Sequence, residues 1–141
     1  MIRYGKTTQQ AIAAVSKLAE VYDGGKTRLS SGQIAEARGL SQAIVAKLLV
    51  ILSQAGIVDG TPGPRGGYAL SREPGDIRFW DIVEQFERQD NDKLCPFGPG
   101  WCGSGKEPCP MHDQFVKLQE STELFLRETT FDVFCIKPAD V

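Results

Sequence analysis

One segment constrains the fold of this chain more than any other, namely residues 60–67, which read Gly-Thr-Pro-Gly-Pro-Arg-Gly-Gly. Glycine and proline fill six of the eight positions. This excludes a helix, because proline lacks a backbone N–H and glycine costs conformational entropy. Short apolar stretches flank the segment at residues 57–58 and 68–70, and each is typical of a strand. The sequence therefore predicts a β-hairpin whose tip carries Arg65.

Three helices are predicted ahead of this hairpin. Apolar residues recur at helical spacing over residues 8–22, 33–38 and 42 to about 54. Gly39 supplies the turn between the second and third helices, and Ser41 stands where it can cap the third. Two short helices joined by a glycine turn form a helix-turn-helix, and a hairpin that follows makes it a winged helix. We therefore expect a mainly α fold with a small β-hairpin wing.

The order of helices and hairpin favours double-stranded DNA as the partner. A helix-turn-helix pattern alone also fits an ordinary helical bundle, and a hairpin alone fits an ordinary solvated turn. The two together are typical of a DNA reader. Lysine and arginine would mainly position the chain on phosphate, while glutamine can read a base edge. The predicted DNA contacts are Arg3, Lys6, Ser41, Gln42, Lys47 and Arg65.

The distribution of charge agrees with this interpretation, although the total charge does not suggest it. The chain has 16 Lys and Arg against 18 Asp and Glu, a net charge of −2. Residues 1–80 carry a net +4 and residues 81–141 a net −6. Such asymmetry is expected when one surface meets a polyanion and another has a different task. It also predicts weak nonspecific DNA affinity, because the acidic half repels the phosphates that the basic half attracts.

Residues 89–112 form a long segment, rich in glycine and proline, that carries the clearest chemistry of the chain. Cys95, Cys102 and Cys109 follow one another at equal spacing, and His112, the only histidine, comes three positions later. Thiolate sulfur and imidazole nitrogen suit a zinc ion or an iron–sulfur cluster. The residues alone leave open a cluster, a structural zinc site, a thiol–disulfide sensor and unrelated buried cysteines. A metal or cluster accounts best for three cysteines gathered beside the lone histidine.

A long amphipathic helix is predicted after the cysteine loop, from Pro110 to about Thr130. Its apolar face has the 4-3-4-3 spacing of a helix pair, at Met111, Phe115, Leu118, Thr122 and Phe125. We interpret it as the dimerisation helix of a homodimer. The chain then divides into a winged-helix part (1–88), a cluster-binding loop (89–112) and a dimerisation helix with the C-terminal tail (110–141). Two-fold symmetry predicts a pseudo-palindromic operator, with half-sites roughly 34 Å or a multiple of it apart.

Two smaller elements complete the expected architecture. A short amphipathic helix over residues 80–87 is expected to pack its apolar side on the winged helix. Cys135 follows an apolar stretch near the end of the chain, and we expect it to be a buried thiol and not a ligand.

Other functional classes are disfavoured. No Ser/His/Asp set and no paired carboxylates are recognisable, so we do not expect an enzyme. The apolar runs are shorter than the roughly 18 residues that span a bilayer, and the first residues lack the apolar core of a signal peptide, so no membrane partner is expected. The cytoplasm is the expected location. The remaining rival is a protein-interaction module built on a winged helix.

The chain resembles the winged-helix iron–sulfur regulators of the IscR, NsrR and RirA type along nearly its whole length. The stretches that carry the resemblance are residues 39–41, 55–58, the wing 63–68 that reads Gly-Pro-Arg-Gly-Gly-Tyr, Ile77 and 81–83. The resemblance implies a transcription regulator that senses iron–sulfur status, redox state or nitric oxide. Gln9-Gln10, Ala46 and Pro62 stand where family members usually carry tyrosine, glutamate and arginine. These departures bear on the operator sequence and not on the mode of binding.

The resemblance also implies a set of cluster ligands. IscR-like members hold a [2Fe–2S] cluster with three cysteines and a histidine three residues after the last, which match Cys95, Cys102, Cys109 and His112. Each gap between cysteines is one residue longer here. NsrR-like members instead use a carboxylate from helix 1 of the partner subunit and hold a [4Fe–4S] cluster, but residues 6–10 contain no carboxylate. The [2Fe–2S] form is therefore favoured over [4Fe–4S], with zinc as the alternative.

Overall fold

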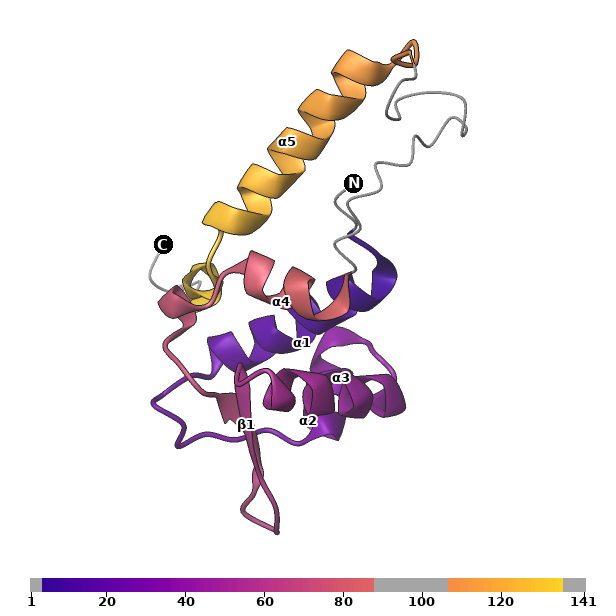
Figure 1. Ribbon diagram of the computed structural model, residues 1–141. Coiled ribbons are helices and arrows are strands. Elements are labelled where there is room, and N and C mark those ends of the chain that lie inside the picture. Colours follow the sequence, from indigo (N-terminus) through magenta and orange to yellow (C-terminus); the bar gives the residue numbers. More distant parts are fainter. Residues whose placement is uncertain (1–3, 88–106, 136–141) are drawn as a thin grey trace.

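The computed structural model describes residues 4–87 and 107–135 of the 141-residue chain. Its helices are α1 (Lys6–Glu20), α2 (Ser31–Arg38), α3 (Gln42–Gln54), α4 (Phe79–Phe86) and α5 (His112–Glu128). Strands β1 (Val58–Thr61) and β2 (Gly67–Leu70) pair as an antiparallel hairpin, and short 3₁₀ turns span Pro74–Asp76 and Phe131–Cys135. The predicted class, mainly α with one hairpin, is confirmed (Figure 1).

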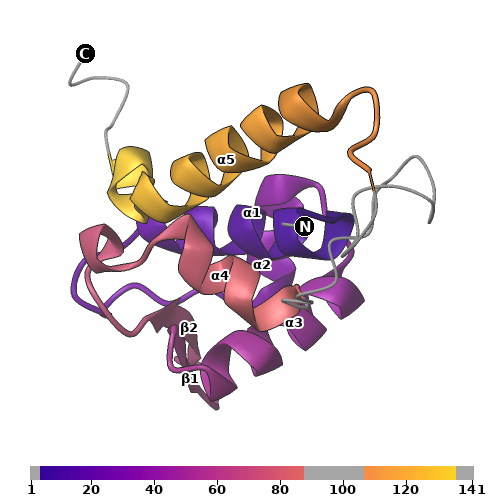
Figure 2. The same ribbon diagram turned by 45° about the horizontal axis from the view of Figure 1, so that its top comes forward.

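Helix α1 lies at the centre of the body that α1 to α4 form (Figure 2). It contacts α2, α3 and α4 as well as the last 3₁₀ turn. Ala11, Ala14 and Ala19 are buried on it, and such small side chains let neighbouring elements approach closely. The core around α1 is completed by aliphatic residues from the other elements: Ile34, Val45, Leu49, Leu52, Ile57, Ile77 and Ile82. Burial of this set is the main driving force for folding of the body.

Helix α4 packs on α1 through its apolar side, as predicted, and it also receives the end of α5. Phe79, Ile82 and Val83 are buried, and Phe86 is partly buried against the same core. The backbone of Phe79 donates to the carbonyl of Thr129, just beyond α5, at 2.9 Å. The Arg127 guanidinium lies over the Trp80 ring at 4.1 Å from its centroid, a cation–π contact. The C-terminal end of α5 is therefore attached to the body.

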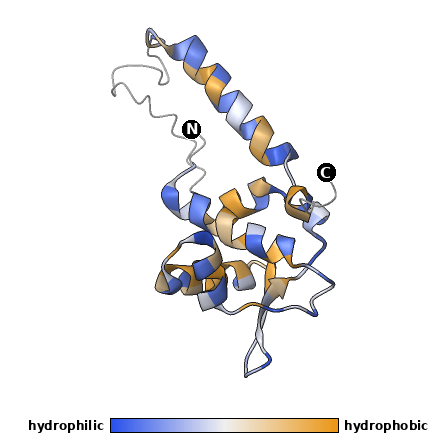
Figure 3. Ribbon diagram, turned by 180° about the vertical axis from the view of Figure 1, so that it is seen from behind, coloured by the Kyte–Doolittle hydropathy of each residue, from blue (hydrophilic) through white to orange (hydrophobic). Residues whose placement is uncertain are grey.

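The rest of α5 projects away from the body. Figures 1 and 3 show that the C-terminal end of α5 lies near α4, while its N-terminal turns extend away from the other helices. Figure 3 also shows several hydrophobic positions along the length of α5. Leu126 is its only buried residue, whereas Leu118 and Phe125 are 62% and 52% exposed. A helix with this much apolar surface uncovered by its own chain is typical of an interaction element.

The helix boundaries agree with the predicted ones to within two residues, and the strands extend into residues 60–61 and 67 of the predicted tip. There are local differences at the helix caps. Helix α1 begins and ends two residues earlier than expected, and α5 begins at His112, so Pro110 lies in the turn before it. Ser41 occupies the N-cap of α3, but its side chain makes no capping hydrogen bond. The expected cap is therefore one of position only.

No helix in the described part of the chain is both long and apolar enough to cross a membrane.

Candidate nucleic-acid interface and cysteine site

Local hydrogen bonds define the start of α2 and the turn that leads from α2 into α3. Ser30 Oγ accepts from the Gln33 backbone N–H at 3.1 Å, while Gln33 Oε1 accepts from the Ser30 N–H at 2.9 Å. This reciprocal pair satisfies two N–H groups that a helix start leaves without partners. Gly39 then ends α2 with φ of 65°, a left-handed conformation that glycine adopts without steric cost. Leu40 N–H donates to Ala35 O at 2.8 Å, which holds the turn closed.

The turn presents the first residues of α3 to solvent. Residues 41–44 are all exposed, whereas Val45, Leu48 and Leu49 on the inner face are buried. A helix-turn-helix reads DNA with the N-terminal residues of its second helix. The exposed start of α3 is therefore the part that would meet base edges.

The hairpin has the geometry of a wing. Its register pairs Val58 with Leu70 and Thr61 with Gly67, leaving residues 62–66 as the tip. At Gly66 a Cβ atom would lie 1.9 Å from Thr61 O, so only glycine fits. Arg65 is exposed at this tip. The tip therefore offers a cationic side chain on a backbone that can come close to a ligand.

The base of the wing is fastened by a segment that sequence reasoning left without a role. Leu29 forms an isolated bridge with Tyr68, its N–H donating to Tyr68 O at 3.0 Å and its carbonyl accepting from Tyr68 N–H at 2.7 Å. Arg28 donates to Asp59 Oδ2 at 2.8 Å and to Asp59 O at 3.1 Å. These bonds tie the α1–α2 connection to both strands. The only signal in the sequence was the short stretch 27–29 between a glycine turn and a cap, which is too brief for a strand prediction.

Five of the six predicted DNA contacts lie in the described part of the chain, on or directly beside three different elements. Ser41, Gln42 and Lys47 are exposed on α3, Arg65 is exposed on the wing, and Lys6 is the exposed first residue of α1. Arg3 lies outside the described residues. The structure thus brings three of the residues together on one helix, with the wing following it in the chain, and it places Lys6 on a separate element.

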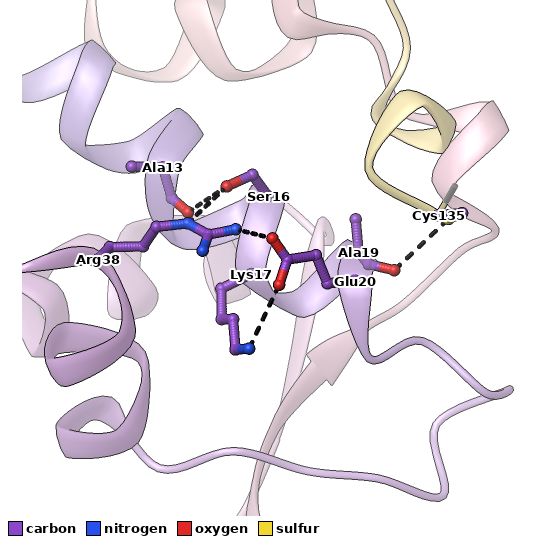
Figure 4. Close-up of polar contacts among 7 residues, drawn as sticks. All are labelled: Ala13, Ser16, Lys17, Ala19, Glu20, Arg38 and Cys135. Atoms are coloured by element: carbon purple, nitrogen blue, oxygen red, sulfur yellow. Dashed lines mark hydrogen bonds and ion pairs between the residues drawn. The ribbon is translucent and has the colours of Figure 1, made fainter. Parts of the chain in front are cut away.

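The charged side chains between α1 and α2 are paired with one another, unlike the predicted DNA contacts. Arg38 of α2 bonds to Glu20 of α1 and also donates to Ser16 Oγ at 3.1 Å (Figure 4). Lys17 reaches the same Glu20 carboxylate at 3.3 Å. By contrast, none of Lys6, Lys47 and Arg65 forms an ion pair with another described residue. Their charges remain available to an external anion.

Glu87 links the end of α4 to the start of α1. Its Oε1 accepts from the backbone N–H of Gly5 at 2.8 Å and from Thr8 Oγ1 at 2.6 Å, and Thr8 is fully buried. A carboxylate at a helix N-terminus is favoured by the helix dipole. Glu87 directly follows α4, so the C-terminal end of α4 is attached to the N-terminus of α1.

Two of the four predicted cluster ligands lie in the described part of the chain. Cys109 is buried, His112 is half-buried at the start of α5, and the His112 N–H donates to Cys109 O at 3.0 Å. Cys95 and Cys102 lie outside it. No group of three or more His, Cys, Asp or Glu side chains that could hold a metal occurs within residues 4–87 and 107–135. The four-ligand set needs the two cysteines beyond those ranges, so it remains a prediction.

Cys135 differs from the expectation of a buried thiol. The 3₁₀ turn buries Phe131 and partly buries Phe134, whose rings lie 4.6 and 6.3 Å from Phe79, and it leaves Cys135 exposed. Its Sγ donates to Ala19 O at 3.5 Å (Figure 4). Partial desolvation, helped by the negative charges of Asp132 and Glu73, raises the pKa of this thiol. A raised pKa lowers the fraction of this thiol that is ionised at neutral pH.

Comparison with known proteins identifies what this arrangement is similar to. The Rrf2 family, described as iron-dependent transcriptional regulators, matches residues 4–136. A protein of Aquifex aeolicus named as an HTH-type transcriptional regulator is 30% identical over 128 residues, which cover 90% of this chain and 87% of that protein. The regulator IscR of Klebsiella pneumoniae is 29% identical over 97 residues, 69% of this chain. The match spans only 58% of the length of that IscR.

Solved structures share the fold over nearly the whole chain. IscR of T. potens superimposes with a TM-score of 0.68 and 26% identity, covering 93% of this chain and 85% of its own. CymR, described as the global cysteine regulator of B. subtilis, superimposes with a TM-score of 0.73 and 24% identity, covering 95% and 97%. At 24% identity, the similarity to CymR shows a shared fold only. Both confirm the winged-helix arrangement that the order of elements predicts.

Proposed function

This chain belongs to the Rrf2 family of transcriptional regulators, and on that premise we propose that it acts as a homodimer in the cytoplasm, on a pseudo-palindromic operator. We further propose that it senses iron–sulfur status, redox state or nitric oxide through a cluster held by Cys95, Cys102, Cys109 and His112. Family members are regulators and not enzymes, which confirms the expectation drawn from the residues.

The observation that carries the proposed mode of DNA binding is the exposed start of α3 beside a fastened wing. Ser41, Gln42 and Lys47 supply polar and cationic groups on α3, and Arg65 supplies a cation at the wing tip. Lys6 and Arg3 would add phosphate contacts from the N-terminal side. Phosphate contacts release counterions, so affinity should fall steeply as salt rises. A protein-interaction module would show no such dependence on a DNA duplex.

The proposed homodimer is supported by the uncovered face of α5. Met111, Leu118 and Phe125 are seven residues apart and exposed, so they form one apolar stripe along the projecting helix. A second copy of α5 would cover this stripe with an identical one, as two-fold symmetric interfaces do. Two winged helices would then be held at a defined separation, which is what a pseudo-palindromic operator requires.

The donor set of the cysteine site fits an iron–sulfur cluster or a zinc ion. A bound cluster would supply a centre that responds to oxidation, iron supply and nitric oxide. Cys109 and His112 are brought within one turn of each other by the hydrogen bond between their backbones, at the N-terminal end of α5. The buried Cys109 and half-buried His112 would be the ligands nearest to the dimer helix.

Both ends of the cysteine loop are attached to elements that matter for DNA binding. One end follows Glu87, which is bonded to the start of α1, and the other enters α5. A change of state in the loop would therefore act on α1 and on α5 together. Because α5 would set the separation of the two winged helices, operator fit would change with it.

The test of the sensing proposal is an anaerobic absorption spectrum, with iron and acid-labile sulfide measured per subunit. A [2Fe–2S] cluster gives visible absorption with about two iron and two sulfide. Cys102→Ala should abolish the absorption and alter operator affinity. Cys135→Ala is the matched control, because it also removes one thiol but one outside the proposed ligand set, and it should keep both properties.

Three results would contradict the sensing proposal. One is bound zinc without sulfide, which would indicate a structural site. Another is a reversible disulfide in metal-free protein, which would indicate a thiol switch. The third is unchanged iron, sulfide and DNA binding in Cys102→Ala. DNA binding itself is tested separately by the salt dependence, so failure of the cluster leaves the regulator standing.

A further inference from the structure

The exposed face of α3 carries apolar residues that the predicted DNA contacts do not use. Ile44 and Ile51 are each 38% exposed, and Val50 is exposed as well, although Val45, Leu48, Leu49 and Leu52 of the same helix are buried. Ile44 belongs to the first turn of α3, two residues after Gln42 and about one turn before Lys47. An isoleucine at the start of a helix that reads DNA can contact an apolar group of a base.

Gln42, a polar residue of the same first turn, lies partly against another helix. A Cβ atom built on Gly32, in the first turn of α2, would lie 3.5 Å from both Cδ and Nε2 of Gln42. The Gln42 amide group therefore lies against α2. Of the exposed residues 41–44, this leaves Ala43 and Ile44 as the apolar surface at the start of α3. The helix thus offers a substantial apolar contact beside its polar ones.

We infer that Ile44 is a specificity-determining residue that contacts the C5 methyl group of a thymine in the major groove. Thymine is the one base that presents a methyl group there, and apolar side chains recognise it. The inference rests on the proposed function, because α3 must enter the groove for Ile44 to reach a base. Lys47, three residues later on the adjacent surface of the helix, would hold that turn against phosphate.

Ile51 provides a matched control within the same helix. It has the same side chain and the same exposed fraction as Ile44, and it lies seven residues further on, which places it on the same face. It is displaced by about 10 Å along the axis towards the C-terminus of α3. Recognition helices read bases with their N-terminal residues, so Ile51 should lie beyond the base that Ile44 contacts.

The experiment begins with an operator selected from random duplexes by the purified dimer. Each thymine of the half-site is then replaced in turn by deoxyuridine, which removes the methyl group and keeps every hydrogen-bonding group. Affinities of the wild-type protein, Ile44→Ala and Ile51→Ala are measured by fluorescence anisotropy at one salt concentration. Because both isoleucines are exposed, neither variant should unfold, and circular dichroism checks this.

At one position per half-site, deoxyuridine should weaken wild-type binding about fourfold, the effect expected for one buried methyl group. Ile44→Ala should bind the two duplexes equally, and Ile51→Ala should keep the fourfold difference. Sensitivity that persists in Ile44→Ala, or no sensitive position at all, would overturn the inference. If neither the wild type nor either variant binds any duplex, the proposed DNA-binding function is itself contradicted. A changed oligomeric state in Ile44→Ala would instead place this residue in a protein interface and overturn the inference too.

Discussion

The winged-helix body and α5 both carry many apolar residues, but they differ in what covers these residues. In the body, Ile34, Val45 and Leu49 are completely buried by other parts of the same chain. On α5, Leu118 and Phe125 are more than half exposed, and Leu126 alone is buried. Contacts within the chain therefore bury the apolar residues of the body, whereas a second molecule is needed to bury the apolar stripe of α5. Matched substitutions in the two regions should separate folding from association.

The largest expected effect is that of Leu49→Ala in the body. It removes a fully buried side chain and leaves a cavity, which costs about 2–5 kcal/mol of unfolding free energy. Urea denaturation followed by circular dichroism measures this cost. A loss below about 1 kcal/mol would mean that the packing around α3 is looser than the structure shows.

The matched change in α5, Leu118→Ala, should act on association and not on folding. Its side chain is 62% exposed in the single chain, so the body loses little, but the proposed dimer loses about 2 kcal/mol of apolar burial. That corresponds to a dimer dissociation constant weakened roughly 30-fold. Sedimentation equilibrium over a range of concentrations measures it. Equal dimer stability in both proteins would place the interface elsewhere.

Two arginines of the wing region sharpen the comparison between structural and binding roles. Arg28 fastens the wing to Asp59, so Arg28→Ala should cost about 1 kcal/mol of stability. Arg65 makes no ion pair with the described residues, so Arg65→Ala should leave stability unchanged. It should instead lower DNA affinity and reduce the slope of log affinity against log salt by about 2, because the proposed dimer loses one phosphate contact from each subunit. Thermal unfolding together with salt titrations distinguishes the two, and an exchange of these roles would contradict the assignment.

The smallest expected effect is a pH dependence at the junction of α1 and α2. Partial desolvation opposes ionisation of Glu20, but hydrogen bonds from Arg38 and Lys17 outweigh it and hold the pKa of this carboxyl below its ordinary value of 4.5. The ion pairs therefore stabilise the fold above that value, and the contribution is lost as pH falls through the lowered pKa. Because the group is partly exposed, it is worth about 0.5 kcal/mol.

Glu20→Gln tests that pH dependence. The variant should be less stable than the wild type near neutral pH and equally stable once the carboxyl is protonated in both states. Urea unfolding at several pH values below and above 4.5 measures the difference. A difference that grows as pH falls would have the wrong sign.

Much of the fold was predictable because its signals are local. The glycine turn at Gly39 and the breakers in residues 60–67 each act over a few residues, and the helix periods lie beside them. The anchoring of the wing by Arg28 and Leu29 was missed, because it depends on pairing with residues 31 to 39 positions away. Cys135 was misplaced because an apolar neighbourhood in sequence does not decide which side of a 3₁₀ turn faces the core.

The candidate site was predictable to a different degree in its two halves. The exposed residues of α3 and the wing follow from helix and hairpin geometry, so Ser41, Gln42, Lys47 and Arg65 lie at the solvent-facing positions that were expected. The engagement of Gln42 with Gly32 was not predictable, because it requires the actual distance between α2 and α3. The complete ligand set of the cysteine loop is a proposal, because it rests on residue types and on resemblance.

We propose that the body binds DNA while α5 joins two bodies into one dimer. The molar mass of the protein–operator complex, measured by sedimentation with the duplex labelled, tests this most directly. We expect two 15.4 kDa chains on each operator. A Leu118→Asp variant should dissociate to single chains, because it would place charges in the apolar stripe of α5. One wild-type chain per operator, or two chains that persist in the variant, would contradict it.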